Sequence, residues 1–386
     1  MKIAIFEFVC GSGTLRAPTS EAQTPSIDHN QWSALLNEGL AMLTTLAIDM
    51  MRCGFAVRTV LEPSIAQKAI TSRWDGTLGS WSLIDYSPTR TVDEIAERWT
   101  QAAQGTDAVI IIAPELDGTL ERIVSFMRDQ GLTVLAGDSC FMQTACDQWH
   151  TCSAWKSAAV RHPDSWLLSE YLNQQHPSDL PTNGPALTQH RGAWVVKRRD
   201  SAGCVGQRRY RNAGLLVEDI RKSSEFETGR EKWIVQPWMD GTPASLAVMC
   251  HPGIGRDAGV VLGCFEQRVE MITENDELDS GYCGFGYAGG TGPVEGIAQE
   301  QLQEFADRVL RALPGQPQGW IGIDFMIEPD GHWTAMEVNP RLTSSYLGYR
   351  KWYGPELAKS WLRGIPPRGL FKEFHRVSFS LENWEG

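Results

Sequence analysis

Two apolar-rich segments joined by an Asp-Gly pair constrain the fold of this chain more than any other feature. Residues 319–328 (GWIGIDFMIE) and 332–339 (HWTAMEVN) lie on either side of Pro329-Asp330-Gly331. Asp-Gly between two such segments predicts a β-hairpin. If Asp330-Gly331 is a two-residue turn, Asp324 lies directly opposite Glu337. A one-residue slip would expose half of the apolar face, so the hydrophobic pattern fixes which side chains share a face.

The polar face of this hairpin predicts a cation site. Asn339 points the same way as Asp324 and Glu337, two residues beyond the pair. Two facing carboxylates repel each other, and a hard cation between them reverses the sign of that interaction. Mg²⁺ prefers oxygen ligands of this kind alongside phosphate oxygens; the alternative is a solvated polar face. The other face is apolar and should enter the core with Ile321, Ile323, Phe325, Ile327, Met336 and Val338.

Cations near the acids suggest a phosphate-binding side of the same site. Pro340 ends the second strand, and Arg341 places a guanidinium beside the acids, where it suits a phosphoryl or carboxylate oxygen. Lys197 ends a predicted strand, and the loop after it is made of small residues and glycines, Gly203 among them. Such a loop lets backbone N–H groups approach phosphate oxygens, although a plain turn has the same composition.

A proline-ended strand offers a place for an adenine. Residues 233–238 (WIVQPW) predict an edge strand, where proline is tolerated. Pro237 lacks an N–H, but the carbonyl of Gln236 and the N–H of Trp238 are available to a base. An ordinary edge strand is the alternative interpretation.

The order of predicted elements divides the chain into an α/β half and an α+β half. Strands and helices alternate up to about residue 140, which indicates an open α/β domain. Strands predominate after Asp147, and residues 275–292 contain many glycines and aromatics, which predicts a ligand-facing loop with 282–292 as a mobile cover. We expect strands at 2–9, 57–61, 109–113, 134–136, 193–199, 232–238, 244–249 and 260–269, and helices at 30–53, 119–130 and 299–313. The expected division is an N-terminal domain 1–140, a central domain 141–360 and a C-terminal tail 361–386.

Composition excludes several classes of protein. The net charge of −12 is unsuited to a general binder of nucleic-acid backbones. Nine cysteines without a CxxC pair indicate reduced thiols and a cytoplasmic protein. We find no run of about 18 apolar residues, so we expect no membrane span.

Taken in order, these elements resemble the ATP-grasp superfamily over about residues 140–350. The matching elements are Lys197 with its loop, the strand 234–239, residues 241–245, Asp324 and Glu337-Val-Asn-Pro-Arg341. Looser motifs are similar to the branch that contains archaeal tyramine–glutamate ligase. These motifs are Glu7, Gly11-Ser-Gly13, Asn37-Glu-Gly-Leu-Ala-Met-Leu43, Asp49, Ala113-Pro-Glu115 and Asn339-Pro-Arg-Leu-Thr-Ser-Ser-Tyr346.

The resemblance implies an ATP-grasp fold with an N-terminal pre-ATP-grasp domain, and a carboxylate–amine ligase that works through an acyl phosphate. It implies ATP and Mg²⁺ (or Mn²⁺) as cofactors, and an amino acid and an amine as small-molecule substrates. The nucleotide would be bound by Lys197, Gly203, Gln236, Trp238 and Ser245. The metal ligands would be Asp324, Glu337 and Asn339, and the catalytic cations Arg341 and Arg268, the latter with a surface arginine as alternative.

One position departs from the superfamily pattern and keeps a second class of function open. Asp147-Gln148 stands where the superfamily usually has Asp-Lys, and that lysine reaches the nucleotide; Lys156 or His150 could substitute. The first hypothesis is a glutamate–amine ligase of methanofuran-type C1-carrier biosynthesis. The others are an ATP-grasp amino-acid or peptide ligase of an unrelated pathway and a nucleotide-binding module without ligase activity. A dinucleotide oxidoreductase is disfavoured because Gly11-Ser-Gly13 lacks the third glycine. We expect no nucleic-acid or membrane partner and leave a homodimer open.

Overall fold

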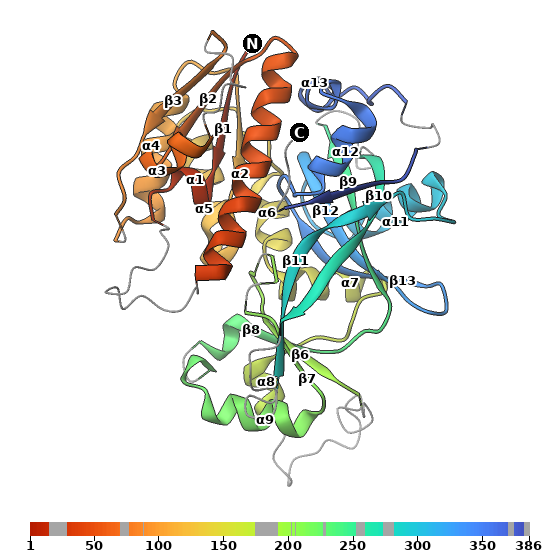
Figure 1. Ribbon diagram of the computed structural model, residues 1–386. Helices are drawn as coiled ribbons and strands as arrows, with labels where there is room; N and C mark the ends of the chain where they lie inside the picture. Colours follow the sequence, from red (N-terminus) through yellow and green to blue (C-terminus); the bar gives the residue numbers. More distant parts are fainter. Residues whose placement is uncertain are drawn as a thin grey trace.

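Two β-sheets organise the chain, one at its N-terminal end and one from residue 166 onward (Figure 1). The computed structural model describes residues 1–14, 29–69, 77–87, 89–173, 192–201, 203–204, 206–226, 229–251, 259–272, 282–369 and 374–381. Parallel strands form the first sheet, and the strands that run beside one another in the second are antiparallel. The expected combination of α/β and α+β architecture is therefore confirmed.

The N-terminal sheet has four parallel strands in the order β3-β2-β1-β4, with helices on both faces. Ile3 and Ile5 pack with helix α2 on one face, and Ala4 and Phe6 pack with α4 and α5 on the other. Cover on both faces explains why β1 from Ile3 to Phe6 and β4 are continuously apolar. The elements are β1 (Lys2–Glu7), α1 (Phe8–Gly11), α2 (His29–Arg52), β2 (Ala56–Leu61), α3 (Pro63–Ala69), β3 (Gly79–Leu83), α4 (Val92–Ala103), β4 (Ala108–Ile112) and α5 (Thr119–Asp129).

The strand order reverses between β1 and β4, because the chain builds outward from β1 on one side and then returns to its other side. Ligands of open α/β sheets bind at such a switch point, beyond the carboxyl ends of the strands. Glu7 ends β1 and pairs with Ile112, the last residue of β4, so Glu7 and the segment that begins at Ala113 meet there.

Among the described residues, the second sheet has ten strands and carries the rest of the fold. Its long strands are β9 (Thr242–Cys250), β10 (Gly259–Ile272), β11 (Tyr282–Gly292), β12 (Gly319–Ile327) and β13 (Trp333–Asn339), with β14 (Val377–Ser380) beside β11. The first two residues of β11 pair with β7, and the rest pair with β10, so β11 joins two parts of the sheet. Helices α6 (Ser139–Ala145), α7 (Gln148–Ser157), α11 (Gln299–Arg311), α12 (Tyr346–Tyr353) and α13 (Glu356–Arg363) accompany these strands.

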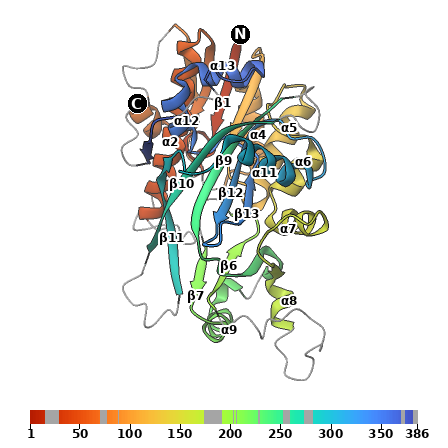
Figure 2. The same cartoon turned by 90° about the vertical axis from the view of Figure 1, so that its right-hand side faces the viewer.

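The short strands of this sheet form a separate small lobe, which lies below the long strands in Figures 1 and 2. We call the described residues of 166–237 the small lobe. Its strands are β5 (Trp166–Leu167), β6 (Trp194–Arg198), β7 (Arg208–Tyr210) and β8 (Trp233–Pro237), and its helices are α8 (Leu168–Asn173) and α9 (Ala213–Lys222). It has its own apolar core around Trp194, Leu216 and Trp233, which lets it pack as a unit beside the main sheet.

Two expected elements are wrong, and several observed elements had no prediction, among them strand β3 and helix α4. Residues 134–136 make only an isolated bridge between Val134 and Val109. Residues 282–292 are strand β11 rather than a loop, and the remainder of the predicted loop, 275–281, lies outside the described residues. Helix α4 begins with a capping box between Thr91 and Glu94 that was readable from the sequence.

Helix α2 is long and apolar enough to qualify as a membrane-span candidate by length and composition alone. The qualifying window is Ser33–Arg52, and 72% of it is buried inside the fold. Its buried face packs on the N-terminal sheet, as in the core helix of a globular domain. We therefore interpret its apolar character as core packing.

Candidate active site

The β12–β13 hairpin places Asp324 directly opposite Glu337, as predicted, but the turn is not the predicted one. Near the turn, Ile327 pairs with Trp333, so five residues rather than two connect the strands. A β-bulge after Asp324 then pairs Phe325 with Ala335 and leaves Met336 as the extra residue. The bulge compensates for the longer turn and restores the Asp324–Glu337 register. It also makes Ala335 the core residue, so the expectation that Met336 enters the core is wrong.

Asp324 lies at the centre of a row of polar side chains on neighbouring strands. Ser245 of β9 pairs with Asp324 on the side opposite Glu337. The Asn339 amide donates to Asp324 Oδ2 at 3.1 Å, and the Gln267 amide of β10 donates to Oδ1 at 3.1 Å. The structure thus brings Asp324, Glu337, Asn339 and Ser245 together, and adds Gln267.

Arg268 is not part of this row. Its guanidinium donates to the carbonyl of Ala288 on β11 at 2.5 Å and lies 3.9 Å from Glu270. About half of the side chain is exposed (51%). Strand alternation explains the difference, because Gln267 and Arg268 are consecutive residues of β10 and point to opposite faces.

Burial raises the pKa of both hairpin carboxyls. The Asp324 pKa rises mainly because the surrounding protein desolvates the carboxylate, although Asn339 and the cations Arg341 and Lys197 oppose the shift. The Glu337 pKa rises further for the same reason, and the nearby Asp324 charge adds to it. The fold therefore holds two carboxylates together whose joint ionisation needs additional positive charge.

Arg341 joins the hairpin to the N-terminal domain. Its guanidinium binds the carboxylate of Glu115 in a bidentate pair at 2.9 and 3.2 Å, and both side chains are almost fully buried. It also lies 3.5 Å from Asn339 Oδ1. The hydrogen bonds therefore run without interruption from Glu115 through Arg341 and Asn339 to Asp324 and Gln267.

Two further glutamates of the N-terminal domain lie near the Arg341–Glu115 pair: Glu38 is close to both Arg341 and Glu115, and Glu7 is close to Glu38. Glu7 is 4% exposed, and its carboxylate lies so close to α2 that a Cβ at Gly39 would be 2.5 Å from it, so this position requires glycine. Burial raises the Glu7 pKa to about 7, although the Cys10 N–H donates to the carboxylate at 2.8 Å. Burial also raises the Glu38 pKa, against the opposing effects of Arg341 and Ser344, and Glu115 adds to the increase. This side of the site is rich in negative charge.

The small lobe supplies Lys197 and Gln236 as buried groups. Lys197 is 5% exposed on β6, close enough to lower the pKa of both hairpin carboxyls. The Gln236 amide donates to Ser165 Oγ at 2.8 Å. Gly203 has a left-handed φ of +63°, and a Cβ there would be 3.8 Å from Glu38, so the loop after β6 approaches the N-terminal domain.

The predicted role of the Trp238 N–H is not available in this structure. That N–H donates to the carbonyl of Ala193 at 2.8 Å. The indole ring instead lies stacked between Phe285, at a centroid distance of 5.5 Å, and the guanidinium of Arg209, at 4.8 Å. The predicted edge strand is therefore wrong, because β8 lies between β6 and β5, and the Trp238 N–H is used in pairing on the β6 side.

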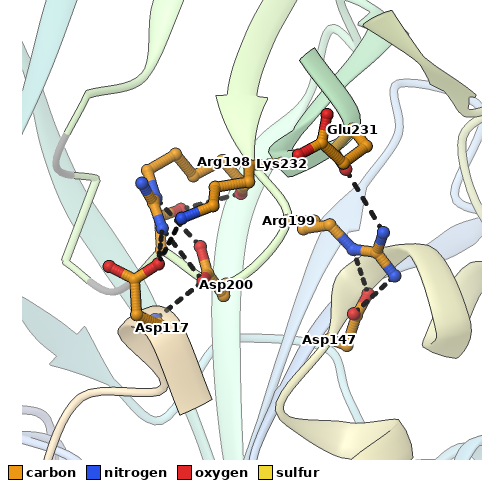
Figure 3. Close-up of polar contacts among 8 residues, drawn as sticks. Asp117, Asp147, Arg198, Arg199, Asp200, Glu231 and Lys232 are labelled. Atoms are coloured by element: carbon orange, nitrogen blue, oxygen red, sulfur yellow. Dashed lines mark hydrogen bonds and ion pairs between the residues drawn. The ribbon is translucent and has the colours of Figure 1, made fainter. Parts of the chain in front are cut away.

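A half-exposed cluster of charges ties the small lobe to the N-terminal domain (Figure 3). The Asp117 carboxylate, beyond the carboxyl end of β4, accepts from Arg198 and Lys232 of the small lobe, both at 2.9 Å. The backbone N–H of Asp117 donates to Asp200 at 2.8 Å. Asp117 has a φ of +50°, so these three contacts hold a strained residue in place. Beside this cluster, Arg199 pairs with Asp147 at 2.6 Å.

Comparison with known proteins identifies the family of this chain. The ATP-grasp domain model matches residues 145–345, and the pre-ATP-grasp model matches residues 70–140. The chain belongs to the ATP-grasp family. The predicted fold, an ATP-grasp domain preceded by a pre-ATP-grasp domain, is confirmed. No curated protein matches the chain.

Solved structures of low sequence identity share this ATP-grasp fold. An ATP-grasp superfamily protein from Archaeoglobus fulgidus is 18% identical, with a TM-score of 0.60, over 97% of this chain and 91% of that one. The biotin carboxylase domain of Hydrogenobacter thermophilus 2-oxoglutarate carboxylase, solved with MgADP and bicarbonate, is 12% identical, with a TM-score of 0.63, over 95% and 70%. Staphylococcus aureus N5-carboxyaminoimidazole synthetase with ADP is 12% identical, with a TM-score of 0.60, over 98% and 80%.

The hairpin of this ATP-grasp protein has the donors that a divalent cation requires. Two facing carboxylates and an amide oxygen form an all-oxygen set, and burial raises the pKa of both carboxyls although Arg341 and Lys197 lie near them. Within the described ranges, no three His, Cys, Asp or Glu side chains converge as a metal site of their own. The residues therefore fit Mg²⁺ or Mn²⁺ that is shared with phosphate oxygens.

Sequence reasoning missed the roles of Gln267 and Glu115 in this ATP-grasp site. Gln267 and Arg268 are consecutive residues of β10, so only one of them can point to the face that carries Asp324 and Glu337. A prediction that had assigned the faces of β10 from the hairpin acids would have chosen Gln267. Glu115 was noted only as part of a motif. Its pairing with Arg341 joins residues 226 positions apart, and no local signal predicts such a pair.

Proposed function

We propose that this protein is an ADP-forming ligase that joins a small carboxylic acid to an amine through an acyl phosphate. The observation that carries the proposal is the convergence of the facing Asp324 and Glu337 with Lys197 and Arg341, beside the switch point of the N-terminal sheet. Membership of the ATP-grasp family supports ATP as the phosphoryl donor. The proposed nucleotide groups remain Lys197, Gly203, Gln236 and Ser245.

In the proposed reaction the protein acts mainly by positioning the reactants and forms no covalent intermediate with them. A carboxylate oxygen of the acid attacks the γ-phosphorus of ATP, and ADP leaves. The amine nitrogen then attacks the acyl carbon, inorganic phosphate leaves, and the nitrogen loses a proton. A divalent cation held by Asp324, Glu337 and Asn339 would neutralise charge on the phosphoryl oxygens.

The side chains of this site divide the reaction between two regions. Lys197 is positioned to hold phosphates from the small lobe. Glu115 holds the Arg341 guanidinium in place between the hairpin and the N-terminal domain. In this position the guanidinium would stabilise the negative charge of the acyl phosphate. Glu7 and Glu38 lie beyond it, where carboxylates favour a substrate with an ammonium group. A raised pKa of about 7 would let Glu7 exchange a proton with such a group near neutral pH.

For the substrates we propose glutamate, through its side-chain carboxylate, and an aromatic amine such as tyramine, in a methanofuran-type C1-carrier pathway. This part of the proposal rests on the looser motifs around Glu7, Glu38 and Glu115. An ATP-grasp ligase for other amino acids is the competing proposal. A nucleotide-binding module without ligase activity is favoured by a single observation, the glutamine at position 148.

A hydroxylamine trap tests the proposal. The enzyme is incubated with Mg²⁺, ATP and hydroxylamine over a panel of acids that includes glutamate, other amino acids and bicarbonate. An acid that forms an acyl phosphate should give a hydroxamate, and its ADP release should accelerate with a suitable amine. Nucleotide binding without acid-dependent ADP release across the panel would favour the binding module instead.

A further inference from the structure

A buried ion pair lies in the apolar core between the N-terminal domain and the C-terminal helices. Asp49 of α2 is fully buried, and its carboxylate accepts from Arg350 of α12 through Nε at 2.9 Å and Nη2 at 2.7 Å. The Tyr346 hydroxyl donates to the same carboxylate at 2.9 Å. Asp49 therefore binds two side chains of α12 at once, 297 and 301 positions further along the chain.

Apolar packing around this pair already holds the two parts of the chain together. Leu46 and Met50 of α2 and Leu347 of α12 belong to one core cluster. Charges are costly to withdraw from water, so a buried ion pair often adds no more stability than apolar side chains of the same volume would. What this pair does add is register, because sliding either helix would leave a buried charge unpaired.

Helix α2 connects Asp49 to the candidate active site. Glu38 precedes Asp49 by 11 residues. This spacing is about three helical turns, so the two carboxylates lie on the same face of the helix. Glu38 is close to Arg341 and Ser344, each of which opposes the increase in its pKa. A shift of α2 along its axis would therefore move Glu38 relative to both residues.

Residues 341–346 lead from the hairpin into α12, and the N-terminal domain holds them at both ends. The first of them pairs with Glu115 at 2.9 and 3.2 Å, and the last donates to Asp49 at 2.9 Å. Ser344, between these ends, is 5% exposed and close to Glu38. Loss of the Asp49 contacts would release one end of this segment while the Glu115 pair still held the other.

We propose that Asp49 is a positioning residue of the ligase, which acts through Glu38 on the substrate that carries an ammonium group. By binding Tyr346 and Arg350, the Asp49 carboxylate sets the distance between Glu38 and the acyl phosphate beside Arg341. A substrate that is misplaced by about 1 Å can react about 100-fold more slowly. The assignment rests on the proposed ligase activity.

Asp49→Asn tests the assignment through its coupling to Glu38. Asparagine keeps the shape of the side chain and removes its charge, so kcat/KM for the ammonium-bearing substrate should fall about ten-fold or more. The MgADP affinity, measured by calorimetric titration, should stay unchanged. In a Glu38→Gln background the same substitution should reduce kcat/KM by less than about two-fold, because the group through which Asp49 acts is already lost. A merely structural role would give the same factor in both backgrounds.

Turnover is followed as ADP release with glutamate and tyramine, or with the acid that the hydroxylamine trap identifies. Tyr346→Phe removes one hydrogen bond to Asp49 and leaves the ion pair intact, so it provides a milder variant if Asp49→Asn does not fold. It should show the same coupling to Glu38 with a smaller loss.

A matched carboxylate in the small lobe provides the control. Asp219 also accepts from an arginine and a tyrosine, Arg208 at 3.1 Å and Tyr210 at 2.5 Å. Asp219→Asn should lower the melting temperature, but any effect on kcat/KM should be the same in the wild-type and Glu38→Gln backgrounds.

Three results would overturn the role of Asp49. These are an unchanged kcat/KM in Asp49→Asn, the same loss in both backgrounds, and a parallel loss of MgADP affinity, which would indicate general disruption of the fold. If the wild-type protein forms neither hydroxamate nor amide with any acid of the panel, the proposed function fails and the role of Asp49 falls with it. If the wild-type protein is active and the coupling to Glu38 is absent, the proposed function stands and only the role of Asp49 falls.

Discussion

Two clusters of charge in this molecule use the same residue types in opposite ways. In the hairpin cluster, Asp324 and Glu337 face each other, and burial raises the pKa of both. In the Asp117 cluster, burial also opposes ionisation, but the hydrogen bond from Lys232 and the charge of Arg198 outweigh it, so the Asp117 pKa is lowered. The Asp117 cluster is neutralised within the fold, whereas we propose that a bound cation completes the hairpin cluster.

Exposure accounts for much of this contrast. The side chain of Asp117 is 56% exposed, so water shares the cost of its charge. Asp324 and Glu337 lie on strands β12 and β13 and are less exposed than Asp117, and burial raises the pKa of both. Two neighbouring carboxyls with raised pKa values are typical of a functional site. We infer that ligand binding, rather than folding, stabilises their charged forms.

The largest effect is expected for Glu337→Gln. Loss of one carboxylate removes a cation ligand and should reduce turnover by more than about 100-fold, because a metal contributes several kcal/mol to a phosphoryl transition state. The ligand-free protein should melt no lower than wild type, since glutamine cannot ionise and burial disfavours the charged form of Glu337. The check is acid-dependent ADP release together with a melting curve. Glu328→Gln, at the end of the same hairpin and paired with Arg161, is the control and should retain turnover.

Lys197→Ala should weaken MgADP binding by about 10- to 100-fold, because a buried cation is removed from phosphate oxygens. Lys222→Ala, in the same lobe but 72% exposed on α9, should leave the affinity unchanged. Calorimetric titration of both variants with MgADP measures the two affinities. If Lys197→Ala bound MgADP as tightly as the wild-type protein, Lys197 would be a buried strand lysine without a role in nucleotide binding.

The two clusters should give stability opposite dependences on pH. The Glu337 pKa is raised from 4.5 to about 8, so the folded protein holds a proton that the unfolded chain releases. The stability this contributes is present below about pH 4.5 and is lost as the pH rises toward 8. For Asp117, whose pKa is lowered, stability is present at neutral pH and is lost in acid below its ordinary value of 3.8.

Melting curves of the metal-free protein between pH 5 and 8 measure the first of these effects. The melting temperature should fall more steeply with pH in wild type than in Glu337→Gln. MgADP should reduce the slope, because it favours the ionised pair. Identical slopes in the two proteins would contradict the raised pKa of Glu337.

The smallest effect is expected for Asp117→Asn. Asparagine tolerates the left-handed conformation that Asp117 adopts, so the variant removes the charge without adding backbone strain. Exposed ion pairs contribute at most about 1 kcal/mol, so the KM for ATP should rise only a few-fold, and salt should reduce the difference. Asp93→Asn, which breaks the exposed pair with Arg122, is the matched control and should not change the KM. A loss as large as that of Lys197→Ala would mean that the two clusters are not distinct.

Local patterns predicted the hairpin acids because alternation fixes the face even where the turn is misjudged. Asp324 and Glu337 were paired correctly although the turn has five residues and a bulge makes up the difference. The pattern could not distinguish this from a tight turn, because Met336 is apolar and fits either a core position or a bulge. The face on which each acid lies was predictable from the sequence, whereas the length of the turn and the bulge were not.

Glycines in β11 show where composition misleads. Their number favoured a loop, yet a Cβ at Gly289 would lie 2.1 Å from the carbonyl of Phe379. These glycines let β14 pair closely with β11, from a part of the chain 90 residues further on. Close approach and flexibility both select glycine, so the sequence alone could not separate them. The Arg341–Glu115 pair was unpredictable for a related reason. Both residues were noted in the sequence, but their contact depends on how the two sheets pack.

The central claim is that the acid is phosphorylated before the amine attacks. The direct measurement uses the acid that gives a hydroxamate, labelled with oxygen-18 in its carboxylate, together with ATP, Mg²⁺ and the amine. Mass analysis follows the nucleotide and phosphate products. An acyl-phosphate route predicts ADP and inorganic phosphate that carries the label from the acid. AMP and pyrophosphate, or phosphate without the label, would contradict the account.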